Sequence, residues 1–320
     1  MKALVLDREL RFDPARADPE PGPGDAVVRV VRAGICGTDI EMVRGYKRAF
    51  RGVPGHEFVG VVESVAGPSG LVGRRVAGEI NVVCGACATC RAGRRTHCER
   101  RTVLGIIGRD GAFAERVVVP VGNLHVLPDS VSDDAAVFVE PLAAAARVAE
   151  QVPCGPGVRA VVVGDGRLGL LVAQVLAIGG ASVTVLGRHA ANVAIVGRRG
   201  IGTALDARDV APGADVVVDA TGTPRGIGAA MELVRPQGTV VLKSTCATGV
   251  VHSVDWNRVV VDEISIVGSR CGPFERAIHL LAAGAVDVAS LVAARYPLDR
   301  GDEAFELASC PGVLKVLLEP

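Results

Sequence analysis

Two short motifs near the start of the chain carry side chains that can bind a metal. Residues Cys36 to Asp39 read C-G-T-D, and Gly55 to Glu57 read G-H-E. A thiolate, an imidazole and a carboxylate are the groups that hold zinc through sulfur, nitrogen and oxygen. A catalytic zinc takes about three protein ligands and keeps one position open. Cys36 and His56 would supply two ligands, and Glu57 or a distant carboxylate the third. The alternative is an ordinary buried thiol and a structural histidine.

Four later cysteines form the most specific motif of the sequence, C-x2-C-x2-C-x7-C. They are Cys84, Cys87, Cys90 and Cys98. Four thiolates within fifteen residues can close a tetrahedron around one zinc ion and leave no open position, so we predict a structural zinc site. The alternatives are an iron–sulfur cluster, which also takes four cysteines, and four unliganded thiols. Ferredoxin-type runs have a different spacing and usually a proline after the last cysteine, where this chain has Glu99.

A glycine-rich turn in the middle of the chain indicates a dinucleotide site. Residues 160–163 form an apolar strand pattern, 164–169 read G-D-G-R-L-G, and 170–178 have a helical pattern. In such a turn the first glycine makes the bend, the second lets the backbone approach a pyrophosphate, and the third lets helix and strand pack closely. The predicted phosphate-binding residues are Gly164, Gly166, Arg167, Leu168 and Gly169.

The next strand, 182–186, indicates which dinucleotide binds. An NAD site usually carries an acid at the end of this strand, but here Gly187-Arg188-His189 follow. Glycine leaves room for a 2′-phosphate, and Arg188 offers it a forked, charged donor. We therefore predict NADP rather than NAD. The alternative is a solvated Arg188 and an enzyme that accepts either cofactor. Four residues further along the chain are also predicted to bind the cofactor: Thr221, Gly222, Ser244 and Ser269.

The composition limits the class of protein. A chain of 320 residues fits two domains, and 35 basic residues balance 35 acidic ones, so no net charge draws it to nucleic acid or to a membrane surface. No apolar stretch reaches the roughly 18 residues of a membrane span. Nine cysteines and a first segment that does not resemble a signal peptide favour a cytoplasmic protein with thiols and metal ligands. The four cysteines outside the motifs are predicted to be ordinary thiols: Cys154, Cys246, Cys271 and Cys310.

Hydrophobic patterns predict an α/β protein with a β-rich first part. Strands are expected at 26–33, 58–66, 112–120 and 124–127, followed by a helix over 133–151. Strands at 160–163, 182–186, 215–219, 239–242 and 264–267 then alternate with helical stretches between the first four, which predicts a parallel sheet covered by helices. Two last strands are expected at 291–296 and 313–318.

The order of these motifs, with Glu140-Pro141-Leu142 between the four cysteines and the glycine turn, resembles the zinc-dependent medium-chain dehydrogenase/reductase superfamily. The E-P-L element is similar to the polyol, sugar and threonine dehydrogenase branch, and 36–41 look most like glucose and aminocyclitol dehydrogenases. The resemblance implies a GroES-like catalytic domain, 1–141 completed by 271–320, around a Rossmann doubly wound parallel-sheet domain, 142–270. It also implies a homodimer or homotetramer.

Carried over by position, the resemblance makes Cys36 and His56 ligands of a catalytic zinc, with Glu57 and Glu140 as the carboxylates around it. Asp39 would orient His56, and Thr38 would hydrogen-bond the reacting hydroxyl. Many relatives carry a proton-relaying histidine where this chain has Glu41, which is either a relay or a surface acid.

The implied activity is zinc-dependent, NADP-linked interconversion of a secondary alcohol and its ketone on a polyol, sugar or (amino)cyclitol-like substrate by hydride transfer. The alternative is a threonine or simple secondary-alcohol dehydrogenase of the same fold, possibly NAD-dependent. Candidate pocket residues are Tyr46, Phe50, Arg109 and Trp256. The segment 187–219 is short for the family, so one Rossmann helix is expected to be trimmed or missing.

Overall fold

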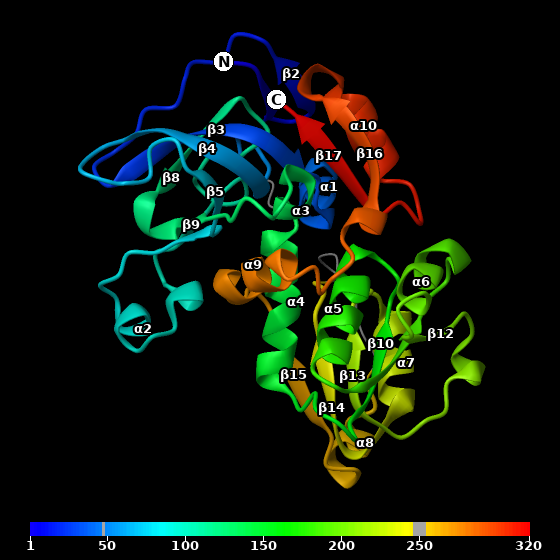
Figure 1. Ribbon diagram of the computed structural model, residues 1–320. Helices are drawn as coiled ribbons and strands as arrows, with labels where there is room; N and C mark the ends of the chain where they lie inside the picture. The colour runs from blue at the N-terminus through cyan, green and yellow to red at the C-terminus, as the bar shows by residue number, and fades with distance from the viewer. Residues whose placement is uncertain (47–48, 246–253) are drawn as a thin grey trace. The chain divides into compact units, whose positions relative to one another are not determined.

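A computed structural model describes residues 1–46, 49–245 and 254–320, and their contacts divide the chain into two units (Figure 1). The first unit consists of Met1–Glu140, Ala277–Ala283 and Leu291–Pro320. The second consists of Pro141–Arg276 and Gly284–Ser290. The first unit is therefore built from both ends of the chain, and the second from its middle.

The first unit is organised around a sheet in the order β16-β17-β3-β4-β5-β9, in which β8 also pairs with β3 (Figure 1). These strands are β3 (Asp25–Gly34), β4 (Glu57–Val65), β5 (Arg75–Gly78), β8 (Arg116–Pro120), β9 (Leu124–Val126), β16 (Val292–Pro297) and β17 (Lys315–Glu319). Two small sheets pair β1 (Ala3–Leu6) with β2 (Leu10–Asp13), and β6 (Asn81–Val82) with β7 (Thr102–Val103). The helices are α1 (Gly37–Val43), α2 (Ala88–Arg91), α3 (Asp133–Ala136) and α10 (Gly301–Ala308), with α9 (Phe274–Ala282) crossing from the second unit.

The prediction of a strand over 112–120 was wrong in its first half, because β8 begins only at Arg116. The backbone N–H groups of Gly111, Ala112 and Phe113 instead donate to carbonyls of residues 53–55, next to the G-H-E motif. This stretch therefore braces the loop before β4. The remaining predicted strands of the first unit are confirmed with small differences at their ends.

The second unit contains a six-stranded parallel sheet in the order β12-β11-β10-β13-β14-β15, as predicted for a doubly wound domain. Its strands are β10 (Arg159–Val163), β11 (Ser182–Leu186), β12 (Gly202–Ala204), β13 (Ala214–Asp219), β14 (Val234–Leu242) and β15 (Ser265–Gly268). Its helices are α5 (Arg167–Ile178), α6 (Ala190–Gly197), α7 (Pro224–Leu233) and α8 (Trp256–Val261), with α4 (Val139–Gln151) leading into it. The connection from β12 to β13 holds only a three-residue 3-10 helix, Ala207–Asp209, which agrees with the expected trimming.

The single helix predicted over 133–151 is broken into α3 and α4. Pro141 lacks the N–H group that would bond to the carbonyl of Val137, so a continuous helix would lose a backbone hydrogen bond there. Proline is tolerated in the first turn of a helix, and α4 accordingly starts at Val139. The break places Glu140 in the first turn of α4.

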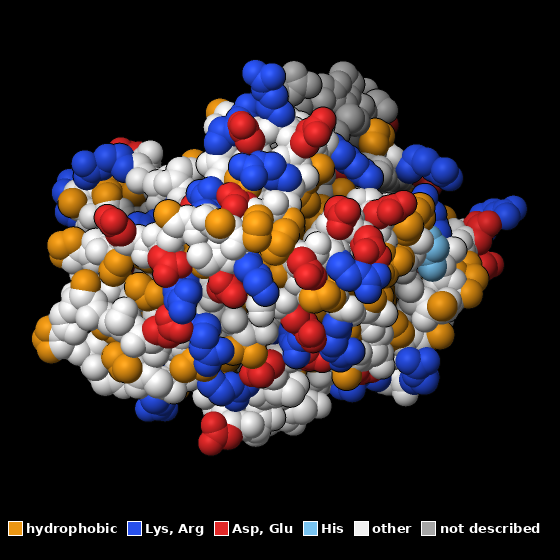
Figure 2. Space-filling view, turned by 90° about the horizontal axis from the view of Figure 1, so that it is seen from above, with side chains coloured by type: hydrophobic (Ala, Val, Ile, Leu, Met, Phe, Trp, Pro, Cys, Tyr) orange, Lys and Arg blue, Asp and Glu red, His pale blue; other side chains and the backbone are white. Residues whose placement is uncertain are grey.

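The surface agrees with the balanced charge of the sequence. On the face shown in Figure 2, acidic and basic side chains are interspersed rather than gathered by sign. Within the described residues, no helix combines the length and the apolar character needed to cross a membrane.

Candidate functional site

The strand register explains how two motifs twenty residues apart come together. β3 and β4 are antiparallel neighbours, and Gly34 at the end of β3 lies opposite Glu57 at the start of β4. Cys36 follows the end of β3 and His56 precedes the start of β4, so both lie at the same end of the strand pair. The potential ligand atoms of Cys36, His56 and Glu57 all lie within 4.8 Å of one another.

Asp39, in the first turn of α1, contacts both Cys36 and His56. Its Oδ2 accepts a hydrogen bond from the N–H of Cys36 at 2.8 Å, as in a capping box. Its Oδ1 lies 3.3 Å from Nδ1 of His56, so the other ring nitrogen, Nε2, would be left to bind a metal. Asp39 is fully buried and His56 is 3 % exposed. Burial lowers the pKa of His56, but Asp39 and Cys36 outweigh it and hold that pKa well above the ordinary value.

The residue before His56 must be a glycine. Gly55 has φ +97°, and a Cβ there would overlap the ring of Phe113. Phe113 is completely buried, so its ring could move aside only by disturbing the packing around it. The G-H-E motif therefore combines a backbone requirement with two candidate ligands.

Lys315 is a member of the site that the sequence analysis missed. Its Nζ forms an ion pair with Oε2 of Glu57 and donates to the carbonyl of Ile35 at 3.3 Å. Lys315 is 0 % exposed and Glu57 is 1 % exposed. The signal was present as one lysine inside the apolar run at 313–318, where a buried charge requires a partner.

The structure does not place the other predicted catalytic residues in the group formed by Cys36, His56 and Glu57. Glu140, half-buried in α4, is not a member of the three-residue group of ligand atoms found among the described residues. Thr38 lies in the first turn of α1 and is partly exposed. The side chain of Glu41 is 46 % exposed, and its Oε1 lies 3.0 Å from Nη1 of Arg44. Its surface position is compatible with both of the roles considered for it.

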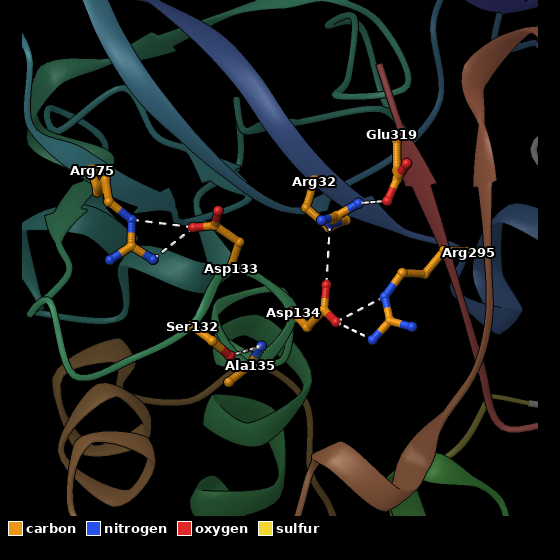
Figure 3. Close-up of polar contacts among 8 residues, drawn as sticks. All are labelled: Arg32, Arg75, Ser132, Asp133, Asp134, Ala135, Arg295 and Glu319. Atoms are coloured by element: carbon orange, nitrogen blue, oxygen red, sulfur yellow. Dashed lines mark hydrogen bonds and ion pairs between the residues drawn. The ribbon is translucent and has the colours of Figure 1, made fainter.

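A network of charged residues anchors α3, which precedes Glu140 in the chain (Figure 3). The Asp134 carboxylate lies 3.1 Å from Nε of Arg32 on β3 and accepts from Nε of Arg295 on β16 at 2.9 Å. Asp133 accepts from Arg75 on β5 at 2.7 Å. Ser132 caps the helix by accepting from the N–H of Ala135, and Glu319 on β17 pairs with Arg32. Arginines on three strands thus fix the start of the segment that carries Glu140, and Glu319 on a fourth strand pairs with one of them.

The sulfur atoms of the four cysteines all lie within 4.8 Å of one another. Sγ of Cys98 lies 3.5 Å from Sγ of Cys84 and 3.9 Å from Sγ of Cys87. A zinc tetrahedron with bonds of about 2.3 Å has sulfur–sulfur distances of about 3.8 Å, so the donor set fits zinc. Backbone N–H groups of Ala86 and Cys87 lower the pKa of Cys84 to about 6, whereas burial raises that of Cys90 to about 12. A metal would therefore be required to hold Cys90 as a thiolate at neutral pH.

The glycine turn has the shape that a pyrophosphate requires. Gly164 adopts φ +119°, and a Cβ on Gly169 would overlap the carbonyl oxygen of Gly164. At Gly166, the N-cap of α5, a Cβ would meet nothing within 4 Å, so the backbone is open there. The turn therefore fits a dinucleotide at the start of a twelve-residue helix.

The remaining predicted cofactor residues lie at the carboxyl ends of the parallel strands. Gly222, with φ +64°, follows β13 and lies so close to Ser244 after β14 that a Cβ would come within 3.2 Å of it. Thr221 donates to the buried Asp219 at 2.7 Å. Ser269 after β15 accepts from the buried Lys243 at 3.2 Å. Ligands of doubly wound sheets bind at this edge.

The four pocket candidates have structural surroundings of their own. Phe50 and Tyr46 pack in an apolar cluster with Leu6 and Met42. Arg109 lies 3.7 Å from Asp25, and Trp256 is 65 % exposed on α8. Of the cysteines without ligand spacing, Cys154 and Cys271 are partly exposed and Cys310 is exposed, whereas Cys246 lies outside the described residues.

Comparison with known proteins agrees with this architecture. Residues 22–129 match the model of the alcohol dehydrogenase GroES-like domain, and 133–319, more than half of the chain, match that of the glucose dehydrogenase C-terminus. The chain is 32 % identical to the L-threonine 3-dehydrogenase of Saccharopolyspora erythraea over 324 residues, covering 94 % of this chain and 93 % of the relative. It is also 32 % identical to the sorbitol dehydrogenase of Halalkalibacterium halodurans over 343 residues, covering 100 % and 99 %.

Solved structures show the same fold over the whole chain. A zinc-binding dehydrogenase from Sinorhizobium meliloti bound to NADP has a TM-score of 0.92 and 28 % identity, covering 100 % of this chain and 99 % of that one. An Escherichia coli alcohol dehydrogenase complexed with NADH has a TM-score of 0.91 and 28 % identity, with the same coverage.

A GroES-like unit and a Rossmann unit in one chain define a dehydrogenase of the medium-chain class. The chain belongs to the zinc-dependent alcohol dehydrogenase family, in its polyol and threonine dehydrogenase branch.

Proposed function

We propose that this dehydrogenase interconverts a secondary alcohol and its ketone on a polyol, sugar or (amino)cyclitol-like substrate. The meeting of Cys36, His56 and Glu57 within 4.8 Å carries the proposal, because sulfur, nitrogen and oxygen donors together suit zinc. The similarity to a sorbitol dehydrogenase and to the glucose dehydrogenase model supports a polyhydroxylated substrate.

When bound, zinc would act as a Lewis acid on the substrate hydroxyl, and the nicotinamide would accept the hydride. Cys36 and His56 would hold the metal, with Glu57 and Glu140 as the carboxylates of its surroundings. Asp39 keeps His56 in the tautomer that presents Nε2. Thr38 would hydrogen-bond the reacting hydroxyl and pass its proton on, and Glu41, exposed on the same helix, offers a route to solvent.

We propose NADP as the cofactor. No acid follows β11, and Arg188 is exposed at this position, where it could pair with a 2′-phosphate. The Arg188→Ala variant should lose far more affinity for NADPH than for NADH, and equal losses would contradict the phosphate role. The NADP-bound relative is consistent with this choice, whereas the NADH-bound relative keeps NAD as the alternative.

A second candidate is a threonine or simple secondary-alcohol dehydrogenase. The 32 % identity to an L-threonine 3-dehydrogenase favours it, since this relative matches as well as the sorbitol dehydrogenase does. Both candidates use the same site residues, so the substrate distinguishes them.

We further propose a homodimer or homotetramer and a cytoplasmic location. Within the described residues β15 pairs only with β14, so its other edge is free, and Trp256, Val260 and Val261 of the preceding helix expose large apolar side chains. The predicted domain limits, 1–141 with 271–320 and 142–270, also remain part of this proposal.

The decisive experiment follows NADPH and NADH absorbance with purified, zinc-loaded protein on three groups of alcohols. These groups are polyols with sugars and cyclitols, L-threonine, and simple secondary alcohols. Turnover of the first group with NADP is expected. The Cys36→Ala and His56→Ala variants should lose turnover while keeping NADPH affinity, with Cys310→Ala as the matched control. A fully active Cys36→Ala variant would contradict the proposed zinc site.

A further inference from the structure

The second residue of the glycine turn, Asp165, does not face solvent. It is 6 % exposed, and its Oδ2 accepts from the N–H of Arg188 at 2.8 Å and from the N–H of His189 at 2.6 Å. The same oxygen lies 3.0 Å from Nδ1 of His189. The turn after β10 thus delivers a carboxylate to the end of β11.

Two neighbouring residues accommodate Asp165 in this position. A Cβ at Gly187 would come within 2.6 Å of Cβ of Asp165 and 2.5 Å of Cγ1 of Val193. The buried Asn192 donates from Nδ2 to the backbone carbonyl of Asp165 at 3.2 Å. Glycine at position 187 is therefore explained by the packing of Asp165, rather than by space for a phosphate alone.

This arrangement changes the chemistry expected at the end of β11. Dinucleotide folds hold the adenosine ribose at the end of the second strand, where an acid binds the 2′-hydroxyl in NAD sites. The acid that β11 lacks is here supplied by the neighbouring turn. The N–H groups of Arg188 and His189 are already engaged by Asp165, so they are not free to bind phosphate oxygens. A 2′-phosphate, which carries a charge of about −2, would also be repelled by this fixed carboxylate.

We propose that Asp165 is a specificity-determining residue for the adenosine 2′ position and that it opposes Arg188. Arg188 attracts a 2′-phosphate, whereas Asp165 repels it and can accept from a free 2′-hydroxyl. The preference for NADP is therefore limited, and the enzyme also binds NAD. This inference rests on the dehydrogenase function proposed above but not on NADP being the preferred cofactor.

The Asp165→Asn variant tests the inference because it keeps an acceptor oxygen and removes the charge. The dissociation constants of NADPH and NADH are measured by calorimetry for the wild type, Asp165→Asn and Arg188→Ala. The ratio of the NADH constant to the NADPH constant should rise about tenfold in Asp165→Asn and fall in Arg188→Ala. Asp129→Asn, an exposed loop acid of the first unit, is the matched control and should leave the ratio unchanged. An unchanged ratio in Asp165→Asn, which includes equal losses of affinity for both cofactors, would overturn the inference.

A second measurement needs no variant and therefore does not depend on the folding of Asp165→Asn. The affinities of the wild type for 2′,5′-ADP and 5′-AMP are measured by their competition with the bound dinucleotide. The first compound carries a 2′-phosphate and the second a free 2′-hydroxyl, so the two affinities compare these groups directly. The two should differ by less than about a hundredfold in affinity, whereas a preference for 2′,5′-ADP above a thousandfold would overturn the opposing role. Failure to bind either dinucleotide would instead contradict the proposed function itself.

Discussion

The ammonium group of Lys315 lies against the carboxylate of Glu57 in the interior of the first unit, and neither side chain reaches solvent. Lys315 comes from β17 near the end of the chain, and Glu57 is the first residue of β4. Glu57 therefore has a cationic partner before any metal binds, and a zinc ion would have to share or replace that partner.

Removal of Lys315 should show how much the stability of the metal-free protein depends on a cation beside Glu57. In the metal-free Lys315→Met protein, Glu57 would keep a buried charge without a cation, so we expect the free energy of unfolding to fall by about 3–5 kcal/mol. Urea denaturation of the metal-free protein measures the loss. Zinc should then raise the melting temperature more in Lys315→Met than in the wild type, because it restores a cation beside Glu57. The double variant with Glu57→Gln should recover part of the loss. Wild-type stability in Lys315→Met would contradict this account.

Asp39 should control zinc affinity without binding zinc itself. The Asp39→Asn variant weakens the hold on Nδ1 of His56, and the loss of such a partner typically lowers metal affinity about 10–100-fold. Competition with a chromophoric chelator measures this change. Glu41→Gln is the matched control, because Glu41 lies on the same helix but is exposed and pairs with Arg44. Equal losses in both variants would show that any charge change on α1 has this effect.

The sequence was most informative where the chemistry is local. The C-x-x-D and G-H-E motifs, the spacing of the four cysteines and the glycine turn each lie within a short segment. The partner of Glu57 could not be predicted in the same way, because Lys315 is separated from it by 258 positions and meets it only through the pairing of β17 with β3. The inward direction of Asp165 likewise depends on a neighbouring strand, and its position in the G-x-G pattern gives no sign of it.

Asp215 provides a pH-dependent part of the stability of the second unit. Its carboxylate accepts from the N–H of Arg159 at 2.7 Å and from Nε of Arg235 at 2.8 Å, and both interactions lower its pKa. A lowered folded-state pKa means that the stabilisation is present above the ordinary value of about 3.9 and is lost as the pH falls through the folded-state value. The stability difference between the wild type and Asp215→Asn should therefore be constant near neutrality and shrink below about pH 4. Urea denaturation across this range measures it, and a difference that grew on acidification would contradict the prediction.

The charged residues that anchor α3 should contribute more to stability than an ordinary surface ion pair does. Asp134 pairs with Arg32 and Arg295 and is 25 % exposed, so we expect Asp134→Asn to cost about 1 kcal/mol. Glu303→Gln removes an exposed pair with Arg300 and should lower the free energy of unfolding much less. Because α3 precedes Glu140, the Asp134 variant should also bind catalytic zinc more weakly, whereas Glu303→Gln should not. Denaturation and zinc titration of both variants provide the test, and equal behaviour would refute a special role for the network.

Loss of the four-cysteine zinc should have a local effect. Of the four cysteines in the loop from Cys84 to Cys98, only Cys90 and Cys98 are buried, so a zinc ion held there would supply most of the order of the loop. The Cys90→Ser variant should bind about one zinc fewer per chain and become sensitive to proteases between residues 84 and 98, while dinucleotide affinity is unchanged. In the wild type, acidification should release this zinc, because the thiolates that hold it become protonated. Cys310→Ser, which removes an exposed free thiol, is the matched control. Metal analysis with limited proteolysis checks both effects, and an unchanged zinc content in Cys90→Ser would exclude a four-cysteine site.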